Sequence, residues 1–392
     1  MDRRSFLRGG LALGCSAAAM PVISHATFAS APFDQRLIVV ILRGAMDGLD
    51  VVRPIGDPGF AAWRPTLAAE RGPDLDGFFA LHPGLGGLMP LWQAGELGFV
   101  QAVSTPYRDQ RSHFDGQDLL EAGTAMDAPT SLRREGWLNR MLQTIPGTTA
   151  QTAFAVGREA LPILTGDARV QRWAPDTRMN VSAQGRLLLD EIYSRDPLFE
   201  AAANTALELS QSITDETMAA APGTPPALTE IDQFAGFATA RMREDTRIVA
   251  LSLAGWDTHA GQGNTIRRPL MRLERLILQL KEGLGPLWGQ TAVLAMTEFG
   301  RTVRENGSAG TDHGTGGAML TAGGAIRGGK VLGKWPGLGE SDLYAGRDLT
   351  PTGDVRSIAA WVMRGLYGLD KTTLESKVFP GLDMAGPPGI LL

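Results

Sequence analysis

Four stretches of the chain are apolar almost throughout and rich in β-branched residues. They cover residues 36–42, 97–103, 247–253 and 291–297. An apolar run of this length, without alternating polar positions, is typical of a strand buried on both faces of a parallel sheet. We therefore expect these four segments to lie next to one another in one sheet. Two shorter apolar segments, 317–320 and 331–332, can add further strands.

Helical periodicity appears between the apolar runs. Residues 265–284 carry apolar side chains at helical spacing, at Leu270, Leu273, Leu276, Ile277 and Leu280. Residues 113–123, 231–242 and 355–366 also favour helices. Strands that alternate with helices predict an α/β fold with a doubly wound, mainly parallel sheet and helices on both of its faces. We expect residues 30–392 to form a single domain of this kind.

Acidic residues follow three of the predicted strands. Asp47, Asp257 and Glu298 each come shortly after the end of an apolar run. Ligands of open α/β sheets bind beyond the carboxyl ends of the strands. These three carboxylates, although distant in the sequence, are therefore expected to converge on one edge of the sheet.

The first residues carry an export signal. Arg3-Arg4-Ser5-Phe6-Leu7-Arg8 is a twin-arginine motif, and the apolar run over residues 9–23 is too short and too rich in glycine and alanine to span a membrane. Cleavage after Ala26 or Ala29 fits the preference for small residues, so we assign residues 1–29 to a signal peptide. This predicts a periplasmic protein exported by the twin-arginine translocase.

Cysteine content and charge exclude several classes of site. Cys15, the only cysteine, lies in the signal peptide, so the mature chain has no disulfide, thiolate ligand or cysteine nucleophile. The chain has a net charge of −5 and no basic run, which argues against nucleic-acid binding. No segment reaches the roughly 18 apolar residues that a transmembrane helix needs.

Histidine is sparse and lies beside acids or hydroxyls. Outside the signal peptide, His113, His259 and His313 occur in Ser112-His-Phe-Asp115, Asp257-Thr-His259 and Thr311-Asp-His313. Imidazole and carboxylate are the usual ligands of zinc, manganese and iron. The recurrence predicts a site for a divalent metal ion such as zinc or manganese. For any one motif alone, the alternative is a capped turn with a hydrogen-bonded imidazole. His82, which precedes Pro83, is better interpreted as structural.

The same motifs resemble those of the bacterial domain of unknown function family 1501 over nearly the whole mature chain. They are the twin-arginine start, Arg43-Gly-x-x-Asp47-Gly-Leu, Arg111-Ser-His-Phe-Asp-x-Gln-Asp118, Gly255-Trp-Asp-Thr-His259, Thr297-Glu-Phe-Gly-Arg301 and Thr311-Asp-His-Gly314. That family is related to the superfamily of alkaline phosphatases, sulfatases and cofactor-independent phosphoglycerate mutases. The resemblance therefore implies an alkaline phosphatase-like fold.

Enzymes of that superfamily hold two divalent ions beside a nucleophile. By order along the chain, the resemblance implies the metal ligands Asp47, Asp257, His259, Glu298 and His313. It places Ser112 in the nucleophile segment. Ser112 can instead cap the helix that follows it, and its neighbour His113 can be the functional residue.

Two departures from the superfamily pattern concern the metal site. The usual Asp-x-x-x-His is shortened to Asp257-x-His259, and Phe299 stands where a histidine would bind the second ion. One metal ion, an altered pair and none all stay open. Arg301, like Arg43 and Arg111, flanks a motif and can either bind an anionic substrate such as phosphate or sulfate or pair with the nearby acids.

Two functions follow from these residues. The first is an exported, metal-dependent hydrolase of phosphate or sulfate esters, in which Ser112 or water attacks the ester and Arg301 or Arg111 offsets charge on a small anionic substrate. The second is a non-catalytic relative of the fold that binds a ligand or partner in the periplasm. Geometry distinguishes them, because a metal centre requires Asp257, His259 and His313 to face a common point.

Overall fold

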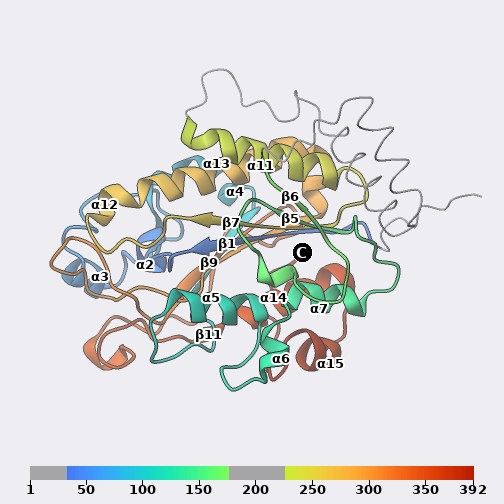
Figure 1. Ribbon diagram of the computed structural model, residues 1–392. Coiled ribbons are helices and arrows are strands. Elements are labelled where there is room, and N and C mark those ends of the chain that lie inside the picture. The colour runs from blue at the N-terminus through green and yellow to red at the C-terminus, as the bar shows by residue number, and fades with distance from the viewer. Residues whose placement is uncertain (1–32, 176–225) are drawn as a thin grey trace, which may run out of the picture. The chain divides into compact units, whose positions relative to one another are not determined.

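The computed structural model describes residues 33–175 and 226–392. The predicted signal peptide lies outside these residues. Within them, a nine-stranded mixed sheet lies between two layers of helices (Figure 1). The predicted α/β class is therefore confirmed.

The centre of the sheet is built from parallel strands. β1 (Arg36–Arg43) pairs in parallel with β7 (Ile248–Ala254) on one side and with β8 (Thr291–Met296) on the other. Beyond β7, the sheet continues in parallel through β5 (Ala153–Val156) and β6 (Gln171–Trp173). Three of the four predicted strands are thus direct neighbours.

The fourth predicted strand, β4 (Leu97–Ser104), lies in the same sheet but not beside the other three. β9 (Gly317–Ala322) is inserted between β8 and β4 and runs antiparallel to both. On its other side, β4 pairs in parallel with the short strands β10 (Val331–Leu332) and β11 (Gly353–Asp354). The expectation of direct adjacency was wrong for β4, because an apolar run reports burial but not which neighbour a strand pairs with.

The two faces of the sheet bury separate apolar cores. Alternate side chains of β1 point to opposite faces, as its period of two requires. One face is covered by α4 (Met89–Gln93), α11 (Pro226–Met242) and α13 (Arg267–Leu284). The other face is covered by α5 (His113–Ala122), α7 (Trp137–Thr144) and α14 (Val355–Tyr367). Figure 1 shows these helices on either side of the strands.

Helix α13 confirms the periodicity read from the sequence. The five predicted apolar positions are 0% exposed and pack on the sheet and on α11. Full burial of each such side chain contributes roughly 1.5–3 kcal/mol, so this stripe anchors the helix.

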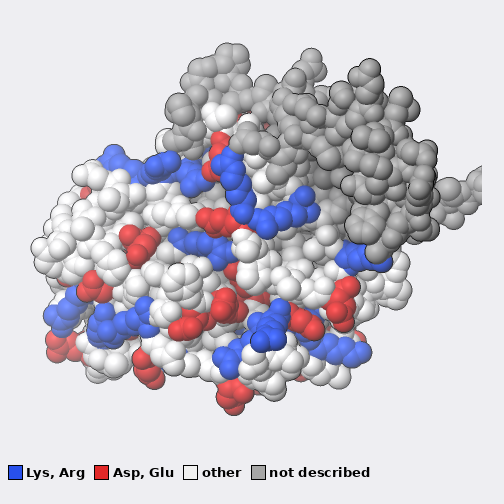
Figure 2. All heavy atoms as spheres, in the orientation of Figure 1, with Lys and Arg blue, Asp and Glu red and all other residues white. Residues whose placement is uncertain are grey.

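Short elements complete the fold. They are α2 (Gly48–Val51), β2 (Val52–Arg53), α3 (Pro58–Trp63), β3 (Ala80–Leu81), α6 (Thr130–Arg133), α12 (Gln262–Thr265) and α15 (Lys371–Thr373), with short helices of other types at Pro83–Leu88, Pro162–Leu164, Gly285–Gln290, Glu340–Asp342 and Leu374–Val378. None of the helices within the described ranges is long and apolar enough to cross a membrane. On the face drawn in Figure 2, basic and acidic side chains are interspersed.

The loops that carry the sequence motifs leave the carboxyl ends of β1, β7 and β8. They approach so closely that Gly44 has no room for a side chain. A Cβ atom there would lie 2.6 Å from the backbone nitrogen of Asp257, and its φ of +112° is one that residues with a side chain rarely adopt. The loops after β1 and β7 are therefore held in direct contact.

Candidate metal centre

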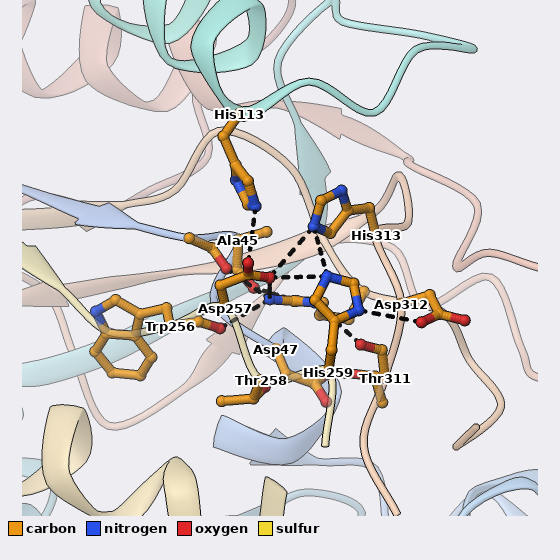
Figure 3. A network of polar contacts seen from close by, with 12 residues as sticks. Ala45, Asp47, His113, Trp256, Asp257, Thr258, His259, Thr311, Asp312 and His313 are labelled. Atoms are coloured by element: carbon orange, nitrogen blue, oxygen red, sulfur yellow. Dashed lines mark hydrogen bonds and ion pairs between the residues drawn. The ribbon is translucent and has the colours of Figure 1, made fainter. Parts of the chain in front are cut away.

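Three side chains from two distant loops meet at this edge of the sheet (Figure 3). The Nε2 atoms of His259 and His313 lie 2.9 Å apart. Oδ1 of Asp257 lies 3.0 Å from the first and 3.3 Å from the second. The predicted grouping of Asp257, His259 and His313 is thus present in the structure.

A third histidine approaches the same carboxylate from the first turn of α5. Nε2 of His113 lies 3.5 Å from Oδ2 of Asp257. His113, Asp257 and His313 each offer one ligand atom, and these three atoms all lie within 4.8 Å of one another. Nε2 of His113 is buried and has no hydrogen-bond partner among the described residues. A buried imidazole nitrogen left without a partner is unfavourable, and its position beside Asp257 fits a ligand for a cation.

Hydrogen bonds at the other ring nitrogen orient all three imidazoles. Nδ1 of His113 contacts Oε1 of Glu298 at 2.8 Å, and Nδ1 of His259 contacts Oδ1 of Asp312 at 3.1 Å. Nδ1 of His313 contacts the carbonyl oxygen of Arg111 at 3.0 Å. Carboxylate and carbonyl oxygens only accept, so these contacts are hydrogen bonds when Nδ1 carries the proton. In that tautomer a neutral ring presents its Nε2 lone pair to the cluster.

This arrangement fits a divalent metal ion. Two ligand atoms at about 2.0–2.1 Å from a tetrahedral zinc ion lie about 3.3 Å apart, close to the spacings of the Nε2 and Oδ1 atoms here. Metal-binding histidines characteristically donate their other N–H to a carboxylate or a carbonyl, as these three do. Without a proton or a cation between them, the facing lone pairs of His259 and His313 would repel each other. The candidate ligands therefore form two overlapping groups that share Asp257 and His313, one completed by His113 and the other by His259.

The buried side chain of Arg301 contacts the cluster through Asp257 and His259. Its side chain is 0% exposed, and Nη2 donates to Oδ1 of Asp257 at 2.6 Å. Nη1 lies 3.5 Å from Nε2 of His259. The three guanidinium nitrogens also donate, at 2.8–3.0 Å, to the carbonyl oxygens of Gly44, Ala45, Trp256 and Thr311. Arg301 is thus fixed within the protein rather than directed toward the solvent.

Electrostatics keep the carboxylates of the cluster ionised. Burial acts to raise the pKa of Asp257, but the hydrogen bond and charge of Arg301, with the adjacent histidines, lower the pKa below its usual value. The same opposition of burial and hydrogen bonds leaves the pKa of Asp312 lowered. The hydrogen bond to Glu298 raises the pKa of His113, whereas burial lowers the pKa of His313. Charges that hold a proton at His113 also suit a metal cation.

Glu298 does not contact Asp257, His259 or His313 but is hydrogen-bonded to Nδ1 of His113. It is 0% exposed, and Oε1 accepts hydrogen bonds from the backbone nitrogens of Gly44 and Ala45 and from the side chains of His113 and Gln117. Burial acts to raise the pKa of Glu298, and these hydrogen bonds lower it. In this structure Glu298 therefore orients a candidate ligand, and the predicted direct ligation has no support from its contacts.

Asp47 is also held away from the three converging imidazoles. It is 1% exposed, and Oδ2 accepts hydrogen bonds of 2.6 Å from both Arg64 and Gln262. Its Oδ1 caps the short helix α2 by accepting from the backbone nitrogen of Leu49. Asp47 lies at the same edge of the sheet, as predicted, but its side chain contacts Arg64, Gln262 and the backbone of Leu49.

Ser112 and Phe299 are neighbours of His113. The hydroxyl oxygen of Ser112 accepts from the backbone nitrogen of Asp115, which makes Ser112 the N-cap of α5. The capping alternative for Ser112 is therefore present in the structure. The ring of Phe299 stacks on His113 with centroids 5.2 Å apart and on Tyr107 with centroids 5.8 Å apart. Phe299 packs against the histidine and cannot bind an ion itself.

A buried amide joins the loops that carry the candidate ligands. Gln262 is 0% exposed, and its Oε1 accepts from the hydroxyls of Thr258 and Thr311 at 2.8 and 2.7 Å. Its Nε2 donates to Asp47 and to Asp50. Sequence reasoning missed Gln262, and it also missed the supporting role of Asp312. Only the position of Asp312 beside His313 in the motif hinted at the latter.

Comparison with known proteins identifies the family. The model of a family described as "Protein of unknown function (DUF1501)" matches residues 56–376. The chain belongs to this family. The resemblance inferred from its motifs is thereby confirmed. No curated protein matches the chain.

Among solved structures, the chain is similar to several proteins at low identity. A protein in the alkaline phosphatase superfamily from Vibrio parahaemolyticus is 11% identical, with 90% of this chain and 73% of that chain covered and a TM-score of 0.41. The lipoteichoic acid synthase LtaP from Listeria monocytogenes is 9% identical, with 88% and 76% covered and a TM-score of 0.41. The C-terminal periplasmic domain of EptC from Escherichia coli, in complex with Zn, is 10% identical, with 75% and 76% covered and a TM-score of 0.33.

Proposed function

We propose that this protein is an exported, metal-dependent hydrolase of phosphate or sulfate esters. The observation that carries the proposal is the convergence of three imidazole Nε2 atoms on the carboxylate of Asp257, with each Nδ1 donating to a fixed acceptor. Such a donor set matches a divalent ion such as zinc or manganese. Asp257 and His259 are 46% and 43% exposed, so a substrate can reach the cluster from solvent.

When bound, a divalent ion supplies Lewis acidity toward an ester oxygen. The chain's own residues account for the rest. Glu298 and Asp312 fix His113 and His259 in one tautomer and one orientation. Arg301 keeps Asp257 ionised and in place. Ser112, which immediately precedes His113, supplies the proposed nucleophilic hydroxyl, and water is the alternative attacking group.

Two arginines support an anionic substrate. Arg111 is exposed, and its carbonyl oxygen holds the ring of His313. Arg347 donates from Nη1 to the carbonyl oxygen of His313 at 2.9 Å and to Asp348 at 2.8 Å, and its side chain is 31% exposed. The backbone of Arg111 and the guanidinium of Arg347 therefore both contact the same candidate ligand. Guanidinium binds phosphate and sulfate oxygens in a forked geometry.

The proposed location is the periplasm. The motif Arg3-Arg4-Ser5-Phe6-Leu7-Arg8 is the support, and the twin-arginine translocase is the expected export partner. Export of a folded chain suits a protein that takes up its metal ion before it crosses the membrane. Metal content measured in protein from the periplasmic fraction tests both points together.

The test of the function combines metal content and hydrolysis. Wild-type protein from the periplasm is expected to carry a divalent metal and to hydrolyse at least one member of a panel of phosphate and sulfate esters. His313→Ala is expected to lose both properties. Asp383→Asn, at an exposed carboxylate, is the matched control and should retain both. A metal-free wild-type protein that hydrolyses none of the esters would instead favour the non-catalytic alternative, a binding protein of the same fold.

A further inference from the structure

We propose that Arg301 takes the place of a second metal ion, so that the centre holds one divalent cation per chain. This inference rests on the metal centre of the proposed function. It concerns the number of ions, which the metal-binding residues alone do not define.

The contacts of Arg301 are those of a structural cation. Its guanidinium donates to Asp257 and to four backbone carbonyl oxygens, which belong to the loops after β1, β7 and β8. Nη2 lies 2.6 Å from Oδ1 of Asp257, which is the oxygen that also faces His259 and His313. A second divalent ion that shared this oxygen would lie against a buried positive charge that cannot move into solvent.

The other carboxylates near the centre already have partners. Asp47 is paired with buried Arg64 at 2.6 Å, and Asp50 is paired with buried Arg53 at 2.6 Å. Glu298 accepts hydrogen bonds at both of its oxygens. These three acids are therefore neutralised by an arginine or saturated by donors, and Phe299 offers no ligand atom.

The decisive experiment counts the ions in the wild-type protein. Protein stripped by a chelator is titrated with zinc alone, and a crystal of the zinc-loaded protein is examined by anomalous scattering at the zinc edge. The expected result is one zinc per chain and one anomalous peak beside the Nε2 atoms of His259 and His313. Two zinc ions per chain would overturn the inference while the proposed function stands. No bound zinc, nor manganese in a parallel titration, would overturn both.

A variant tests the role of the guanidinium itself. In Arg301→Ala, four carbonyl oxygens and Asp257 face the vacated volume, and guanidinium ion in the buffer can enter it. Because Arg301 holds the carboxylate of Asp257 in place, we expect its removal to lower zinc affinity at least tenfold. The affinity should recover when millimolar guanidinium is added. Arg304→Ala removes an arginine that is 49% exposed and pairs with Glu340, and it should change neither value. Unchanged zinc affinity in a folded Arg301→Ala protein would overturn the role of Arg301. If that variant does not fold, the wild-type stoichiometry decides the question.

Discussion

The Nε2 atoms of His259 and His313 face each other across 2.9 Å, although the two residues are 54 positions apart. Each ring is turned by an acceptor at its Nδ1, Asp312 for the first and the carbonyl oxygen of Arg111 for the second. Two lone pairs at this distance are favourable only with a cation or a proton between them. The geometry therefore favours a proton or a cation at this position.

Metal removal is expected to destabilise the folded chain. A ligand that binds the folded state alone stabilises it by about 2.7 kcal/mol at one hundred times its dissociation constant. Thermal unfolding monitored by circular dichroism should show a higher Tm with added zinc than with a chelator. The same comparison in Asp257→Asn should show little difference. A zinc-induced rise in Tm as large in that variant as in the wild type would contradict the assigned ligands.

The carboxylates behind the histidines are expected to tune metal affinity. Glu298→Gln and Asp312→Asn replace an ionised acceptor with an amide that can also donate, which weakens the orientation of His113 and His259. Loss of such supporting hydrogen bonds typically lowers metal affinity by about 10–100-fold. Isothermal titration with zinc measures the change. Glu340→Gln, at a carboxylate that is 78% exposed, is the control that should bind zinc like the wild type.

Ser112 can be examined as a cap and as a nucleophile in separate variants. Ser112→Ala removes the N-cap of α5 and should lower the free energy of unfolding by about 1 kcal/mol, whereas Ser112→Asn retains a capping oxygen. The proposed nucleophile predicts that both variants lose ester hydrolysis while binding zinc normally. Normal turnover in Ser112→Asn would assign the attack to water. Urea unfolding and single-turnover kinetics give the two readouts.

His82 is expected to make stability depend on pH. Burial lowers its pKa from 6.5 to about 4, and its Nδ1 accepts a hydrogen bond from the backbone nitrogen of Gly84. The unfolded chain therefore binds a proton at a higher pH than the folded chain does. This contribution is complete above about pH 6.5 and is lost as the pH falls toward 4, with about 2 kcal/mol lost at pH 5.

The measurement for His82 compares urea unfolding at pH 7 and pH 5 in the presence of a chelator, so that metal loss does not contribute. His82→Asn keeps a capping side chain before Pro83 but does not titrate in this range. Its free energy of unfolding should fall by about 2 kcal/mol less than that of the wild type between the two pH values. An equal fall in both proteins would show that His82 is not the group that titrates.

Much of the fold was predictable because it depends on local pattern. The apolar runs that became β1, β4, β7 and β8 and the stripe on α13 report burial directly. The inserted strand β9 was predicted as a short strand, but not its place between β8 and β4. Pairing order depends on how the whole chain packs, and an apolar segment that is buried on both faces fits several neighbours equally well.

The candidate site, too, was predictable from the sequence only in part. The strand ends predicted that Asp47, Asp257 and Glu298 converge at the carboxyl edge of the sheet, and the motif order shared with the family added His259 and His313 to that edge. Tertiary structure decided that His113 turns its Nε2 toward Asp257 while Glu298 turns away to hold it, and that Arg301 is buried against the same carboxylate. The reason is physical. A buried charge is stable only beside its partners, and which residues become partners depends on distances between loops that lie 44 positions apart in the sequence for Arg301 and Asp257 and 185 apart for His113 and Glu298.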